Sequence, residues 1–128
     1  MVKLNAQPLK EVNGVKFGMK RAEVREILGD AKEFKKNKFS KMTTDDFGYC
    51  HVYYNNNNEC EAIEIFNDAE VSLKGQTIFP GNMEEIKNLV SDLTEEDGSY
   101  ISVSQSVGIY APDGRMESIL FGCSGYYE

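Results

Sequence analysis

The sequence predicts an α+β fold, in which an antiparallel sheet carries helices packed on one of its faces. Three observations support this fold class. Two segments place apolar residues at helical spacing, several others are rich in aromatic and β-branched residues, and turns containing Gly or Asn separate them. The chain has 128 residues, of which 41% are hydrophobic and 27% charged, as is usual for a globular protein. We therefore expect a single domain over residues 1–128.

The first helix is expected over residues 20–28. Val24, Ile27 and Leu28 fall at positions i, i+3 and i+4, so a helix would place them on one face. Gly29 comes directly after the last apolar residue, where a helix end favours a residue that accepts positive φ. Local spacing and the end signal therefore agree on this element.

A hairpin is expected after this helix. Residues 31–46 are rich in lysine and read as an exposed connection with one short strand. Residues 47–54 are rich in aromatic residues and predict a strand, and the asparagines at 55–58 predict a tight turn. The returning strand is expected over 60–66, and a short strand over 70–73 follows it.

A second helix is expected over residues 83–93. Asn82 is a suitable N-cap, and acidic residues follow it at the positive end of the helix dipole. The apolar stripe of this helix consists of Ile86, Leu89, Val90 and Leu93. An acidic turn ends it, and a second strong turn lies at 111–114. The remaining strands are expected over residues 100–104, 107–110 and 116–122.

The two halves of the sequence resemble each other. At one constant offset the pairs are Phe17 with Phe79, Val24 with Ile86 and Ile27 with Leu89, and at a second they are Tyr54 with Tyr110 and Ile63 with Ile119. We expect two helix–hairpin repeats, over about 15–73 and 78–124, that form one sheet with both helices on the same face. The alternative is that any two amphipathic helix–hairpin units would align this well.

The other face of such a sheet would be free to bind a partner. Strand alternation separates Glu64 and Phe66 from the core residues Ile63 and Ile65. A slip of one residue in the hairpin register would exchange the two sets. The expected partner-binding residues are Tyr49, His51, Tyr53, Glu64 and Phe66 on this face, and Asp45, Asp46, Glu59, Glu95, Glu96 and Asp97 in acidic loops.

The charge balance narrows the class of partner. The formal net charge is −7, from 21 acidic and 14 basic side chains. This balance argues against nucleic-acid and membrane binding, which need clustered lysine and arginine. It favours a protein partner with a basic surface, such as a toxin or effector domain, for example a nuclease. The alternative is that the charge only keeps the protein soluble.

The cysteines suggest a reducing compartment. Cys50, Cys60 and Cys123 form neither a CxxC motif nor an even set, so they predict free thiols rather than a disulfide framework or a zinc site. No long apolar run occurs near the first residues. We therefore expect a cytoplasmic protein that needs no metal.

The sequence offers little that could support catalysis or a cofactor. His51 is the only histidine, and its neighbour Cys50 would point to the opposite side of a strand. No phosphate-binding glycine motif follows a predicted strand, and no acidic cluster has the spacing of a calcium loop. We expect a protein that is not an enzyme and that binds neither cofactor nor metal. A small enzyme that uses His51 is the alternative.

One segment resembles known families. The run Phe17-Gly18-Met19 … Glu23-Val24 … Ile27-Leu28-Gly29 resembles the GMT-x-x-x-V-x-x-x-LG opening of tandem-repeat β-lactamase inhibitor proteins. It is also similar to small lipoproteins of outer-membrane protein assembly. The resemblance implies helices paired with an antiparallel sheet and a function in protein binding.

An acidic inhibitor of this kind is similar, at class level, to the immunity proteins of contact-dependent and other polymorphic bacterial toxins. We therefore expect an immunity protein that occludes the active site or substrate groove of a toxin. An assembly or scaffold module of the outer-membrane lipoprotein type is the alternative.

Overall fold

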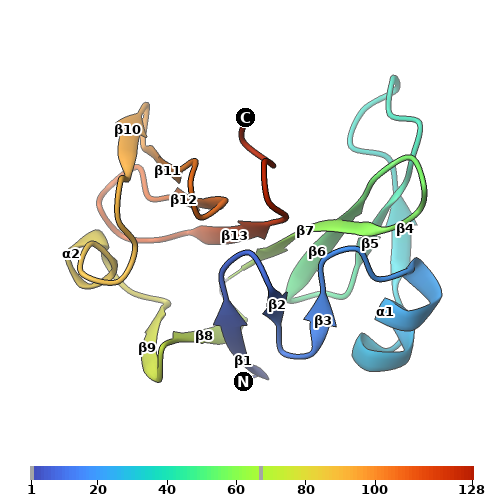
Figure 1. Cartoon of the computed structure of the whole chain (residues 1–128), viewed down its shortest axis with the longest axis horizontal. Helices are drawn as coiled ribbons and strands as arrows, with labels where there is room; N and C mark the ends of the chain where they lie inside the picture. Colours follow the sequence, from blue (N-terminus) through green and yellow to red (C-terminus); the bar gives the residue numbers. More distant parts are fainter. Residues whose placement is uncertain (1, 67) are drawn as a thin grey trace.

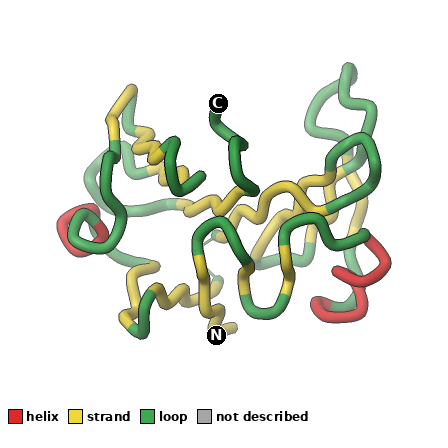
Figure 2. The backbone as a smooth tube through the Cα atoms, in the orientation of Figure 1, coloured by secondary structure: helices red, strands yellow, loops and turns green. Residues whose placement is uncertain are grey.

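The computed structural model of the chain describes residues 2–66 and 68–128, and it consists mainly of β-strands in two sheets (Figures 1 and 2). The larger sheet is antiparallel and runs β10 (Thr94–Glu96), β11 (Ser99–Ser102), β12 (Val107–Tyr110), β13 (Ser118–Gly122), β7 (Cys60–Ile65), β6 (Cys50–Tyr54), β5 (Thr44–Asp46) and β4 (Lys32–Phe34). The smaller sheet runs β3 (Val15–Lys16), β2 (Glu11–Val12), β1 (Val2–Gln7), β8 (Ala69–Leu73) and β9 (Gln76–Phe79). The helices are α1 (Arg21–Leu28) and α2 (Met83–Ile86).

The predicted fold class, an α+β fold with helices packed on one sheet face, is wrong. The two helices have only 8 and 4 residues. The smaller sheet provides a large part of the layer that faces the larger one, and residues of both sheets form a single hydrophobic core (Figure 1). Leu4, Val71 and Phe79 of the smaller sheet belong to the same buried cluster as Ile63 and Phe121 of the larger sheet.

The prediction of two tandem helix–hairpin repeats is also wrong, because the larger sheet is not built from two hairpins. Each half of it is a run of four antiparallel strands, β4–β7 and β10–β13, joined where β7 pairs with β13. What the halves do share is a backbone hydrogen bond that ties the segment before each helix to a segment further along the chain. In each half, the carbonyl group two residues before the helix is the acceptor. Cys60 N donates to Met19 O at 2.8 Å, and Met116 N donates to Gly81 O at 2.8 Å.

The second helix is much shorter than predicted. It begins after Asn82 as expected but ends at Ile86, and a hydrogen-bonded turn continues to Val90. The apolar side chains of the predicted stripe are still buried or half-buried, so the turn satisfies their burial without a helix. Asn88 and Ser91 favour hydrogen bonds that compete with helix formation, and a short helix is hard to nucleate.

The larger sheet is curved, and its two ends rise on either side of the segment 123–128 (Figure 1). We call the face toward this segment the concave face. Ile63, Ile65 and Phe121 point to the opposite face and are at most 2% exposed. The smaller sheet and both helices lie on that opposite side. None of the described helices is long and apolar enough to cross a lipid bilayer.

Candidate functional site

The strand register places the predicted surface residues of the central strands together. His51 pairs with Glu64, and Glu64 pairs in turn with Leu120, so these three side chains share the concave face. Tyr53 pairs with Ala62 and lies on the same side. The observed pairing agrees with the expected grouping of His51, Tyr53 and Glu64.

This face is less open than the sequence indicated, because the segment 123–128 lies over its middle. The rings of Tyr126 and Tyr127 meet edge to face at 5.1 Å. A Cβ atom on Gly108 would lie 1.9 Å from Tyr127 Oη, and one on Gly122 would overlap Tyr126. The two strand glycines therefore provide the room in which this segment packs.

Two of the aromatic residues predicted to bind a partner are buried or half-buried. Tyr53 is only 8% exposed. Tyr49 precedes β6, is half-buried and packs against the hydrophobic core. The prediction that Tyr53 is an exposed anchor is wrong, because neighbouring side chains cover a ring that strand alternation alone would leave in solvent. For Tyr49, which is half-buried like His51 and Phe66, a role in binding stays a prediction.

A pocket with apolar and polar lining residues lies beside Tyr127 on the concave face. Tyr53 Oη donates to Glu64 Oε1 at 2.5 Å, and Ser118 Oγ donates to Glu64 Oε2 at 3.2 Å. Burial, and then the hydrogen bond to Glu64, raise the pKa of the Tyr53 phenol, so it remains a donor. The pocket has a volume of about 230 Å³. Its lining includes Glu64, Ile101, Tyr110, Ser118, Leu120 and Tyr127.

An aromatic cluster lies around His51. The ring of His51 is 5.0 Å from that of Phe34 and 4.7 Å from that of Phe66, with both contacts edge to face. Its Nε2 atom is 3.6 Å from Asp46 Oδ1. Phe34, on edge strand β4, is 37% exposed, so the cluster reaches the surface. Phe34 was not predicted as a site residue, although an aromatic residue among lysines was a usable signal.

The cysteines offer no reactive thiolate next to His51. All three are free, and burial raises the pKa values of the Cys50 and Cys60 thiols to about 12. Cys50 points into the core and is 1% exposed. Cys123, by contrast, is half-buried at the end of β13. Within residues 2–66 and 68–128, no three His, Cys, Asp or Glu side chains are arranged to hold a metal ion.

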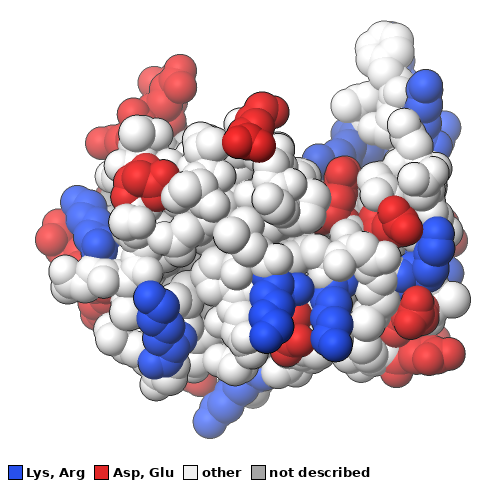
Figure 3. Space-filling model, in the orientation of Figure 1, with Lys and Arg blue, Asp and Glu red and all other residues white. Residues whose placement is uncertain are grey.

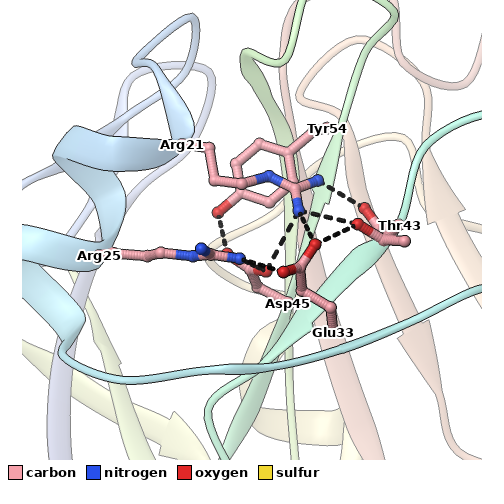
Figure 4. A network of polar contacts seen from close by, with 6 residues as sticks. All are labelled: Arg21, Arg25, Glu33, Thr43, Asp45 and Tyr54. Atoms are coloured by element: carbon pink, nitrogen blue, oxygen red, sulfur yellow. Dashed lines mark hydrogen bonds and ion pairs between the residues drawn. The ribbon is translucent and has the colours of Figure 1, made fainter.

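A buried ionic network lies on the opposite side of the sheet, under α1 (Figure 4). Arg25 binds both carboxylate oxygens of Asp45, at 2.7 and 2.9 Å, and Tyr54 Oη donates to Asp45 at 2.8 Å. Arg21 lies over the ring of Tyr54 at 4.1 Å and pairs with Glu33 at 2.9 Å. The network therefore fastens α1 to β4, β5 and β6.

The prediction that Asp45 lies in an exposed acidic loop and binds a partner there is wrong, because Asp45 is buried. Its side chain is 0% exposed. Burial opposes its ionisation, but the hydrogen bonds from Arg25 and Tyr54 and the charges of the two arginines outweigh that effect and lower its pKa. Arg21 and Arg25 lie one helical turn apart, so an acidic partner for both was foreseeable.

The other acidic residues lie at separate places on the surface. Glu59 is half-buried beside Lys20, at 3.5 Å, away from the concave face. Glu95, Glu96 and Asp97 are exposed where β10 turns into β11, and acidic side chains gather there in Figure 3. Lysines gather at the opposite end of the concave face, on the connection from β4 to β5. The sequence did not predict this separation of charge along the surface.

The lysine-rich connection also carries the most exposed aromatic side chain described in the structure. Phe39 is 82% exposed at its tip. An aromatic ring on an exposed loop is a common contact in protein interfaces. We note it as a candidate contact residue that sequence reasoning missed.

Comparison with known proteins provides no assignment: no family model, no curated protein and no solved structure matches this chain. The function therefore has to be inferred from the geometry of the concave face.

Proposed function

We propose that this chain is an immunity-type inhibitor, which binds a basic toxin through its concave face and occludes the toxin's active site or substrate groove. The observation that carries the proposal is the concave face itself. It is curved, and although the segment 123–128 and Lys36 cover part of it, the aromatic side chains of Phe34 and Tyr110 remain exposed on it. Concave surfaces with aromatic anchors and polar rims are typical of protein interfaces.

The aromatic residues on this face would supply the main contact area. Phe34 is 37% and Tyr110 is 44% exposed, and they belong to strands in different halves of the sheet. His51 and Phe66 lie next to Phe34 and are half-buried. Aromatic side chains lose little conformational entropy on binding, and those near the centre of an interface dominate its energy.

The acidic residues would favour a basic partner. Glu95, Glu96 and Asp97 stand at one end of the concave face with no covering element among the described residues, in a chain of net charge −7. Such charges accelerate the encounter with a basic protein and contribute less to the final affinity. The lysines at the other end would repel a uniformly basic surface, so we expect the partner's basic patch to lie over β10 and β11.

The proposal is tested by co-expressing this chain with the product of the adjacent gene in a sensitive host. We expect rescue of growth and a one-to-one complex in solution. Replacing both Phe34 and Tyr110 with Ala should abolish rescue, because each removed anchor is expected to cost about 2 kcal/mol of binding free energy. Ile27→Ala is the matched control, since Ile27 is 45% exposed on α1, away from this face.

Two results would contradict the proposal. One is that no protein forms a stoichiometric complex with the chain and no rescue occurs. The other is that the Phe34 and Tyr110 double variant rescues growth as well as Ile27→Ala does. The thermal unfolding of all variants should be measured first, so that a loss of rescue is not mistaken for a loss of folding.

A further inference from the structure

We propose that the pocket beside Tyr127, here called the Glu64 pocket, receives a lysine or arginine side chain of the partner protein. That the side chain belongs to a partner protein rests on the proposed function. That the pocket binds a cationic side chain rests on the structure of the pocket. Three properties carry it: the size of the pocket, the carboxylate in its lining and the mixed apolar and aromatic walls.

The size of the pocket fits one long side chain. Its volume of about 230 Å³ lies below the ~300–1,000 Å³ that is usual for sites of drug-sized ligands. Ile101 and Leu120 provide apolar walls. Lysine and arginine bury their methylene stems along apolar surface while the charged end remains hydrated or paired.

The carboxylate of Glu64 provides the charge that such a side chain would meet. Tyr53 and Ser118 each donate one hydrogen bond to it and so fix its position. Each carboxylate oxygen can accept a further hydrogen bond. Among the described residues, no charged nitrogen of a lysine or arginine lies within 4.0 Å of a Glu64 carboxylate oxygen.

Lys36, which lies beside Tyr53, is already engaged elsewhere. Lys36 Nζ lies 3.9 Å from the centre of the Tyr53 ring, rather than at the Glu64 carboxylate. The Glu64 carboxylate therefore accepts hydrogen bonds but has no lysine or arginine ion-pair partner among the described residues. A cationic side chain that enters from outside would complete the arrangement.

The tyrosines around the pocket suit a cation as well. Tyr110 and Tyr127 both line it, and Tyr110 is 44% exposed at its opening. Aromatic rings attract ammonium and guanidinium groups, and arginine stacks on them more readily than lysine does. We therefore expect arginine to bind more tightly than lysine.

The test is an NMR titration of the full chain with three small probes. They are the Nα-acetyl amides of arginine, lysine and citrulline, of which citrulline has the shape of arginine without its charge. We expect saturable shifts at the backbone amides of Gly108, Leu120 and Tyr127 with arginine and lysine, and none with citrulline. Equal binding of citrulline and arginine, or no shifts at these amides at molar-range probe concentrations, would overturn the inference.

A matched pair of variants separates a specific site from net charge. Glu64→Gln keeps the shape and a hydrogen-bond acceptor in the pocket, and it should weaken arginine binding at least tenfold. Glu70→Gln removes the same formal charge from β8 in the smaller sheet, and it should leave binding unchanged. Equal affinities of Glu64→Gln and the parent protein would exclude the carboxylate as the receptor.

A third variant keeps the test decisive if Glu64→Gln does not fold. Leu120→Phe retains the carboxylate but fills the pocket, and it should abolish the arginine shifts. Because the titration needs no partner, its outcome is independent of the rescue experiment. Equally strong rescue by the parent and Glu64→Gln proteins would overturn the inference and leave the proposed function intact. Arginine binding in the pocket without any rescue would support the ligand chemistry of the pocket and contradict the proposed function.

Discussion

The two halves of the larger sheet are held to their helices in opposite ways. Arg21 and Met83 are each the first residue of the short helix in their half, and each is at most 8% exposed. Arg21 enters an ionic network around the buried Asp45, whereas Met83 packs in the hydrophobic core. The first position of the helix is therefore buried in a polar network in one half and in the hydrophobic core in the other.

The ionic network makes the half that contains α1 more sensitive to single substitutions than the apolar contact makes the other half. A buried ion pair contributes little net free energy, since desolvation offsets much of the attraction, but loss of one partner leaves a charge that nothing compensates. An apolar contact loses only its own burial energy. We expect the half that contains α1 to show the larger and more pH-sensitive effects.

The largest effect is expected for Asp45→Asn. This change leaves two arginines beside a neutral side chain, and it should lower the free energy of unfolding by about 3 kcal/mol or more. Asp92→Asn in the other half is the matched control, because Asp92 is exposed and its side-chain hydrogen bonds come from Ser102 and Ser104 rather than from a charged group. Urea unfolding measures both. A loss for Asp45→Asn no greater than that for Asp92→Asn would contradict the comparison.

A smaller effect is expected for Gly108→Ala, which tests how the segment 123–128 covers the sheet. The new Cβ would overlap Tyr127 Oη, so the variant should lose about 1–3 kcal/mol, as overpacked sites do. Adding Tyr127→Ala removes the overlap, so the double variant should lose less than the sum of the two single changes. Additive losses would mean that the two residues do not meet in solution.

The pH dependence should come mainly from the half that contains α1. Because the pKa of Asp45 is lowered in the folded state, its ionised form stabilises the fold above the ordinary aspartate pKa of about 3.9. That contribution is lost as the pH falls through the lower folded-state pKa. The midpoint of thermal unfolding should therefore fall more steeply for the parent protein than for Asp45→Asn below about pH 4. Parallel curves would contradict this assignment.

The smallest effect is expected for Lys87→Met. Lys87 lies four positions after Met83, as Arg25 does after Arg21, but its only close acidic partner in the described structure is the exposed Glu84, at 3.8 Å. Exposed ion pairs are worth about 0–1 kcal/mol, so the change should alter stability by no more than about 0.5 kcal/mol. Arg25→Met should cost clearly more. Equal losses of unfolding free energy for the two variants in urea would show that the arginine network stabilises the fold no more than an exposed ion pair does.

Local patterns predicted the elements that depend on neighbouring residues. The helix near Val24 and the strands that pair His51 with Glu64 follow from spacing and alternation, which act over a few residues. The smaller sheet was missed because its central pairing is parallel and joins residues far apart in the chain, such as Leu4 and Val71. No local pattern in the sequence connects two such segments. Whether a second sheet or a layer of helices covers the larger sheet therefore depends on packing across the whole core.

The candidate site was predicted only in part, because local patterns do not show contacts between segments that are far apart in the chain. Alternation placed His51 and Glu64 on one face, but it could not show that Tyr126 and Tyr127 would return over that face. Gly108 and Gly122 inside predicted strands were a signal of close approach that could have been used. Asp45 looked like part of an exposed acidic loop, and only its contacts with Arg21 and Arg25 across the fold explain its burial.

The unequal accessibility of the three cysteines has a practical consequence. Cys50 and Cys60 are each 1% exposed, whereas Cys123 is half-buried where the chain leaves β13. A maleimide dye added to the native protein should therefore attach predominantly at Cys123, without any engineered labelling position. The fluorophore would stand next to Tyr126, in the segment that lies over the concave face, where its emission could report the arrival of a binding partner in real time.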